Sequence, residues 1–252
     1  MPSAIAIAAH PDDIEFLMAG TLLRLKQAGY EIHYFNLADG CCGSTVTDRE
    51  TTARIRLAEA QEAAKFLGAT HYRPICHDLE IFYEKSLLAK VAAVIREAKP
   101  EIVLTHAPSD YMEDHQNACR LAVTAAFTRG MPNYVTDPQR AVSDVKITVY
   151  HAQPYGNCDP LRRPVEPEIF VDVGEVVERK VEALARHVSQ KRWLDESQGL
   201  DSYLEALRQA DRAVGKLSGK FEFAEGWRRH LHLGFCGPDD DPLSAALRRW
   251  LA

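Results

Sequence analysis

The sequence lacks long apolar runs and lacks an excess of basic residues. No run approaches the roughly 20 residues that a membrane-spanning helix requires, so we expect no membrane association. The 252-residue chain has 30 Lys and Arg against 36 Asp and Glu, a net charge of −6. This charge argues against a nucleic-acid partner, which usually meets a basic face. We therefore expect the partner to be a small molecule.

The sequence also lacks the usual signs of secretion. Its beginning has no basic segment followed by an apolar stretch and a small-residue cleavage site. Its six cysteines include no C-x-x-C pair and are too scattered for a disulfide scaffold. We expect a cytoplasmic protein in a reducing compartment, in which the adjacent Cys41 and Cys42 are ordinary loop thiols rather than a redox site.

Short apolar runs alternate with longer amphipathic stretches through the first part of the chain. The predicted strands are Ala4–Ala9, Glu31–Leu37, Thr70–Cys76 and Ile102–Thr105, and the predicted helices between them are Ile14–Ala28, Asp48–Leu67 and Ser86–Ala98. Such alternation is typical of an α/β protein with right-handed crossovers. We predict a Rossmann-like three-layer sandwich built on a mainly parallel sheet.

The length of the chain favours a single domain over residues 1–252. Further strands are predicted at 146–150 and 169–173, which places the Rossmann-like core at about residues 3–175. The remainder, about 175–252, is predicted to be mostly helical. Its last helix, starting at Asp241-Pro242, either packs on the core or forms an interface between copies, so a homo-oligomer is left open.

Chemically active side chains follow several of the predicted strands. His10 ends the first strand, Asp78 follows the third, and the segment from His106 to His115 follows the fourth. Ligands of parallel α/β sheets bind outside the carboxyl ends of the strands. We therefore expect these side chains to face one cleft.

The segment His10-Pro11-Asp12-Asp13 is the strongest local signal. An Asp after a strand is often only a helix cap, and the same holds for the Asp-His pair at 114–115. Convergence of the two segments at the switch point of the sheet would instead bring two imidazoles and several carboxylates together. His10, Asp13 and His115 then supply the N, N and O ligands of a catalytic zinc site, although Fe²⁺ or another divalent metal also suits this set. Asp12 is left free to take a proton from metal-bound water.

Several motifs resemble those of the LmbE-like (PIG-L) family of zinc-dependent N-acetylglucosaminyl deacetylases. They are A-H-P-D-D-I-E at 9–15, G-T-L at 20–22, L-A-D-G at 37–40, R-x-x-E at 56–59, D-H at 114–115 and A-E-G at 224–226. The resemblance implies that an N-acetylated amino sugar or N-acyl glycoside is hydrolysed at its amide. It implies that metal-bound water attacks the carbonyl, with Asp12 as the general base. It also implies that His10, Asp13 and His115 bind zinc and that Arg56, Asp78 and Asp114 lie in the substrate cleft.

One position departs from the family pattern. Many members have a histidine three residues before the ligand His115, where this chain has Met112. A thioether cannot protonate the leaving amine or stabilise an oxyanion. His106 and His151, at the ends of two predicted strands, are candidates to supply this group, unless both are structural histidines. Alternatively, Asp12 alone moves the proton from water to amine.

Two other functions remain compatible with the sequence. Met112 leaves open a non-catalytic, metal-containing carbohydrate-binding protein. The two-His, one-carboxylate set also leaves open an Fe²⁺-dependent oxygenase, although such enzymes are normally all-β barrels.

Overall fold

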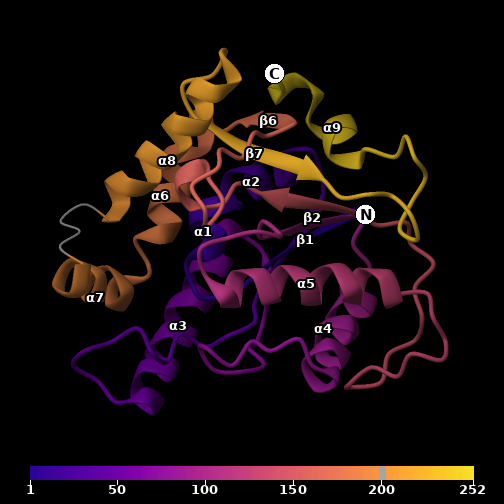
Figure 1. Ribbon diagram of the computed structural model, residues 1–252, viewed down its shortest axis with the longest axis horizontal. Helices are drawn as coiled ribbons and strands as arrows, with labels where there is room; N and C mark the ends of the chain where they lie inside the picture. The colour runs from indigo at the N-terminus through magenta and orange to yellow at the C-terminus, as the bar shows by residue number, and fades with distance from the viewer. Residues whose placement is uncertain (199–202) are drawn as a thin grey trace.

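A seven-stranded sheet forms the centre of the computed structural model, which describes residues 1–198 and 203–252 (Figure 1). Its strand order is β3-β2-β1-β4-β5-β7-β6. Strands β1 to β5 are parallel, and β7 is antiparallel to both of its neighbours. The predicted α/β fold with a mainly parallel sheet is therefore confirmed. The strands are β1 (Ser3–Ala8), β2 (Glu31–Asn36), β3 (Thr70–Tyr72), β4 (Ile102–Thr105), β5 (Thr148–Ala152), β6 (Ile169–Asp172) and β7 (Ala224–Arg229).

Helices cover both faces of this sheet. On one face, α4 and α5 lie side by side (Figure 1). The opposite face carries α1, α2, α3, α6 and α9, while α7 and α8 lie at one side of the molecule. None of the described helices is long and apolar enough to cross a membrane. The helices are α1 (Asp13–Leu17), α2 (Ala19–Gln27), α3 (Arg49–Leu67), α4 (Lys85–Ala98), α5 (Glu113–Thr128), α6 (Val177–Leu184), α7 (Val188–Gln198), α8 (Tyr203–Ser218) and α9 (Pro242–Leu247).

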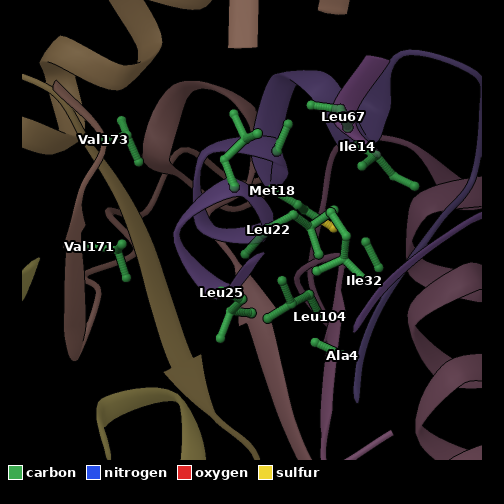
Figure 2. Close-up of a cluster of buried hydrophobic side chains, with 14 of the residues drawn as sticks. Ala4, Ile14, Met18, Leu22, Leu25, Ile32, Leu67, Leu104, Val171 and Val173 are labelled. Atoms are coloured by element: carbon green, nitrogen blue, oxygen red, sulfur yellow. The ribbon is translucent and has the colours of Figure 1, made fainter. Parts of the chain in front are cut away.

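Strand β1 is buried on both faces, which explains its apolar sequence from Ala4 onward. Its side chains alternate, so that Ala4 packs with the α1–α2 side and Ile5 with the α4–α5 side. Figure 2 shows the first of these clusters, where Leu22 and Met18 pack against Leu104 of the sheet. Packing on both faces of β1 thus fixes the position at which the strand ends.

Strand β1 pairs in parallel with β2 on one side and with β4 on the other. The chain therefore reverses its order of strands between β1 and β4, the switch point predicted from the sequence. The segments that follow these two strands leave the same edge of the sheet side by side. This topology brings His10 and His115 to one crevice.

The predicted helix at 14–28 is divided in two at Met18, and α2 begins anew at Ala19. The carboxylate of Glu225, in β7, accepts hydrogen bonds from the N–H groups of Gly20 and Thr21, at 2.8 and 2.7 Å. These are unpaired amides of a first helical turn, where a negative charge is stabilising. A Cβ on Gly20 would lie 2.5 Å from the Val173 side chain. The stretches G-T-L and A-E-G therefore meet in space, and Gly20 is needed for close packing.

Strand β7 lies in the part that the sequence predicted to be mostly helical. It completes the sheet between β5 and β6 instead of standing outside it. Its residues A-E-G-W-R-R show no alternation of apolar and polar side chains, so periodicity gave no strand signal. In the final helix, Leu243 and Leu247 are buried, which confirms that this helix packs on the core.

A buried ion-pair cluster joins the C-terminal elements. The Lys180 ammonium group in α6 lies 2.7 Å from carboxylate oxygens of both Asp211 in α8 and Glu225 in β7. All three side chains are buried. Because a buried charge is tolerated only when it is paired, each member depends on the others.

Replacing Lys180 by methionine tests this dependence. Lys180→Met keeps most of the volume but leaves two carboxylates buried without a cation, so we expect a loss of about 3–5 kcal/mol in the free energy of unfolding. Urea unfolding followed by circular dichroism measures it. Lys216→Met, at an exposed position of α8, is the matched control and should change stability by less than about 0.5 kcal/mol. Equal stability of the two variants would contradict the proposed role of the cluster.

Candidate metal centre and active-site pocket

His10, Asp13 and His115 come together at the end of β1 and the start of α5. The Asp13 carboxylate lies 3.4 Å from His10 Nδ1 and 3.4 Å from His115 Nε2. All three offer ligand atoms within 4.8 Å of one another. A tetrahedral zinc site with bonds near 2.0–2.2 Å has ligand atoms about 3.3–3.5 Å apart. The three side chains therefore fit a divalent metal in both type and spacing.

Each of the two histidines is held from behind by a carboxylate. Asp114 Oδ2 lies 2.9 Å from His10 Nε2, and Asp110 Oδ1 lies 3.0 Å from His115 Nδ1. These contacts fix the rings so that the other nitrogens face Asp13. Carboxylates commonly orient metal-binding imidazoles in this way. Asp110 and Asp114 would therefore form the outer shell of a metal held by His10, Asp13 and His115.

One of these two carboxylates was predicted to lie elsewhere, and the other was not predicted. Asp114 was expected in the substrate cleft, but it lies behind His10 and also accepts the Leu79 N–H, at 2.7 Å. It is not part of the pocket wall. Asp110 was not predicted, although ligand histidines commonly have a carboxylate partner and Asp110 lies only five residues before His115.

The charges of the centre favour a bound cation. Burial alone would lower the pKa of His10, but Asp114 and Asp13 raise it to about 9. Burial likewise opposes the charge of His115, whose pKa Asp13 and Asp110 raise to about 10. Burial would raise the pKa of Asp13, yet His115 and His10 hold it well below its usual value. The carboxylates thus favour the protonated, positively charged imidazoles. A bound metal ion would supply positive charge at the same place.

Asp12 lies beside these ligands in a strained backbone conformation. Its φ of 97° is in the left-handed region, which non-glycine residues rarely adopt. Arg56 in α3 stabilises this turn, since its Nη2 donates to Pro11 O at 2.5 Å and lies 3.7 Å from Asp12 Oδ1. Strain of this kind persists where surrounding structure enforces it and is common at active sites.

The hydroxyl of Tyr203, in α8, donates a hydrogen bond to Asp12 Oδ2. Burial raises the pKa of Asp12 to about 6, while Arg56 and this hydrogen bond act in the opposite direction. Tyr203 was not predicted, because it lies 191 residues away along the chain and no local motif marks it. The Asp12 carboxylate, the predicted base, therefore contacts side chains from both the N-terminal and the C-terminal part of the chain.

His106 and His151 do not face the pocket. His106 Nε2 accepts the Ala9 N–H at 3.0 Å, and its ring stacks on that of His115 with centroids 4.1 Å apart. His151 contacts His106 O and His230 Nδ1, at 3.0 and 2.9 Å. Burial lowers the pKa of His151 to about 4. Neither ring lines the pocket or is placed to protonate a leaving amine, so this prediction is corrected: His106 packs on His115 from behind, and His151 contacts His106 rather than the cluster itself.

A pocket of about 640 Å³ opens over the centre. Asp78 lies in its wall and accepts the N–H groups of Gly40 and Cys42, at 2.7 and 2.9 Å, which shapes the loop after β2. Each Asp78 oxygen accepts one of these bonds and has a further lone pair. The thiols of Cys41 and Cys42 are free and 3.9 Å apart. The pocket is lined by His10, Asp12, Asp13, Phe16, Leu17, Cys42, Gly43, Arg56, Asp78, Leu79, Tyr111, Met112, His115, Tyr155, Gln190, Leu194, Tyr203 and Ala206.

Comparison with known proteins gives consistent matches. Residues 5–127 match the family model PIG-L, described as GlcNAc-PI de-N-acetylase. Diacetylchitobiose deacetylase of Thermococcus kodakarensis is 30% identical over 193 residues, which cover 74% of this chain and 69% of that protein. A solved structure of N,N′-diacetylchitobiose deacetylase from Pyrococcus horikoshii has the same fold, with a TM-score of 0.74 and 23% identity, covering 96% of this chain and 88% of that one.

One relative has a different activity in its name. The 4-oxalmesaconate hydratase of Pseudomonas putida is 28% identical over 190 residues, 72% of this chain and 71% of that protein. Relatives at this level of identity therefore include both a deacetylase and a hydratase. The residues of the pocket must decide which of the two activities fits this chain better.

Removing the carboxylates behind the histidines tests their role. We expect Asp110→Asn and Asp114→Asn each to weaken zinc affinity about 10- to 100-fold, because the ligand imidazoles lose their orienting partners. Competition with a coloured chelator measures the affinity. Asp144→Asn, at an exposed position, is the control and should bind zinc like the unchanged protein. Unaltered affinity in both the Asp110 and the Asp114 variant would exclude an outer-shell role.

Proposed function

Because the chain belongs to the PIG-L (LmbE-like) family, we propose that it is a zinc-dependent hydrolase that removes the N-acetyl group from an amino sugar or N-acyl glycoside. The observation that carries the proposal is the cluster of His10, Asp13 and His115 beside Asp12, at the floor of an open pocket. Three protein ligands leave a metal position for water or substrate, as in catalytic rather than structural zinc sites.

Different residues of the pocket have different roles in the proposed amide hydrolysis. His10, Asp13 and His115 would hold the metal, which lowers the pKa of water and polarises a carbonyl when bound. Asp12 takes the proton from the attacking water. Its Oδ2 already accepts the Tyr203 hydroxyl, and Arg56 holds the preceding turn, so the carboxylate is oriented before substrate arrives.

The leaving amine also needs a proton. Among the described residues, no imidazole other than those of His10 and His115 lines the pocket, and the thioether of Met112 there cannot donate a proton. We therefore assign this step to Asp12 as well, which returns to the amine the proton that it took from water.

Hydration of an unsaturated tricarboxylate, suggested by the relative named 4-oxalmesaconate hydratase, fits the pocket less well. Such a substrate requires several cations, and Arg56 is the only Lys or Arg among the described residues of the wall. Its guanidinium is already bonded to Pro11 O. A deacetylase acting on a neutral sugar needs no such cations.

Acetate release from a panel of N-acetylated sugars and glycosides, with zinc present and removed, tests the function. We expect Asp12→Asn to retain zinc but to lose about 10²- to 10⁴-fold in turnover, because the general base is removed. Asp239→Asn, an exposed substitution, controls for the loss of a carboxylate elsewhere. Turnover retained by Asp12→Asn would disprove the role of this residue. Oxygen consumption or hydration of 4-oxalmesaconate, without acetate release, would reject the proposed reaction.

A further inference from the structure

Another group of metal-ligand side chains lies in the two loops that follow β2 and β3. The pairing of these strands continues past their ends, since Ala38 forms a parallel bridge with Cys76. The next residues, Asp39 and His77, are neighbours, and Asp39 Oδ2 lies 2.6 Å from His77 Nδ1. Together with Cys41, which follows in the first loop, they offer ligand atoms within 4.8 Å of one another.

The types and spacing of these groups suit zinc. Zinc binds thiolate sulfur, imidazole nitrogen and carboxylate oxygen, and a structural zinc site has four such ligands. The thiol of Cys42 can supply the fourth, since its Sγ lies 3.9 Å from that of Cys41. Two sulfurs bound to one tetrahedral zinc, with bonds of about 2.3 Å, are ~3.8 Å apart. The two thiols are therefore already spaced for a single metal ion.

The charges around Cys41 also favour a cation. Burial, together with the carboxylates of Asp39 and Asp78, raises the pKa of the Cys41 thiol to about 12. The negative groups that oppose a free thiolate would stabilise a bound metal ion, which displaces the thiol proton. The guanidinium of Arg49 also approaches Cys41, but it is paired with the carboxylate of Glu80 at 2.5 Å.

This group of side chains borders the pocket but is separate from the candidate metal centre at the end of β1. Cys42 and Gly43 line the pocket, whereas Asp39, Cys41 and His77 do not. The His77 side chain is 50% exposed, so that an ion can enter from solvent. A metal ion held by both loops would fix the wall segment that carries Cys42 to the end of β3.

We propose that the loops after β2 and β3 hold a second zinc ion. Its ligands are Asp39, Cys41, Cys42 and His77. On binding, zinc replaces the two thiol protons and the proton of the hydrogen bond between Asp39 and His77. The site ties the two loops together and takes no part in hydrolysis, so it does not depend on the proposed deacetylase function.

The first experiment uses Cd²⁺ as a probe, because cadmium thiolates absorb in the ultraviolet and thiolates are the ligands that soft metals prefer. The reduced, metal-stripped full chain is titrated with Cd²⁺. We expect a thiolate band that saturates with one ion, that Cys41→Ser removes and that His10→Ala retains. Cys158→Ser, at a half-buried thiol in the loop after β5, is the matched control and should keep the band.

Three outcomes of this titration overturn the proposal. They are the absence of a thiolate band in the unchanged protein, a band that survives Cys41→Ser, and a band that is lost in His10→Ala. A band that depends on Cys42 alone would be a case of the second outcome, with cadmium bound to one exposed thiol. Acetate release is not measured, so failure of the deacetylase function would leave these results unaffected.

The second experiment tests the contribution of the other loop through His77. We expect the metal-stripped chain to bind two zinc ions in competition with a chelator. His77→Ala should weaken one of them at least about 100-fold, because loss of a ligand costs more than loss of an outer-shell partner. His232→Ala, at a half-exposed position outside both loops, is the control. Uptake of a single zinc ion by the unchanged chain, or equal affinities in the two variants, would exclude this site.

Discussion

The candidate active site depends on the contacts of one group, the Asp13 carboxylate. It accepts the His10 backbone N–H at 2.7 Å and lies 3.4 Å from the His10, His106 and His115 rings. Segments that follow β1 and β4 are thereby joined through one negative charge. Because that charge is buried, it requires positive charge nearby, and the surrounding carboxylates increase this requirement. The orientation of the histidines, the position of the neighbouring Asp12 and the proposed metal site all follow from this constraint.

Residues of the C-terminal part contact and support elements formed by the first half of the chain. Glu225 caps α2, Lys180 holds Glu225 and Asp211 together, and Tyr203 binds Asp12. In addition, the Glu59 carboxylate in α3 accepts the N–H and hydroxyl of Ser189 at the start of α7, at 2.8 and 2.6 Å. The R-x-x-E motif therefore supports the pocket twice, once through Arg56 at the Asp12 turn and once by anchoring the helix that forms the opposite wall.

The sequence predicted those features that depend on short-range patterns. Apolar strands alternating with helices implied that β1 and β4 are neighbours, and this adjacency brought His10 and His115 together. Features that depend on distant contacts were missed, as with Tyr203 and the polar-rich strand β7. Position at a strand end also failed to distinguish a pocket residue from a supporting one. His106 and Asp114 occupy the predicted edge, but their rings and oxygens are used behind the metal ligands.

The separation between the metal ligands and the partner of Asp12 has a consequence for biosynthesis. His10, Asp13 and His115 are all synthesised before Tyr203 and Glu225. A nascent chain therefore carries its metal-binding groups long before Asp12 gains its tyrosine and before α2 gains its cap. The candidate metal ligands are thus available before the hydrogen bond that orients Asp12, and a chain that ends before Tyr203 would have the former without the latter.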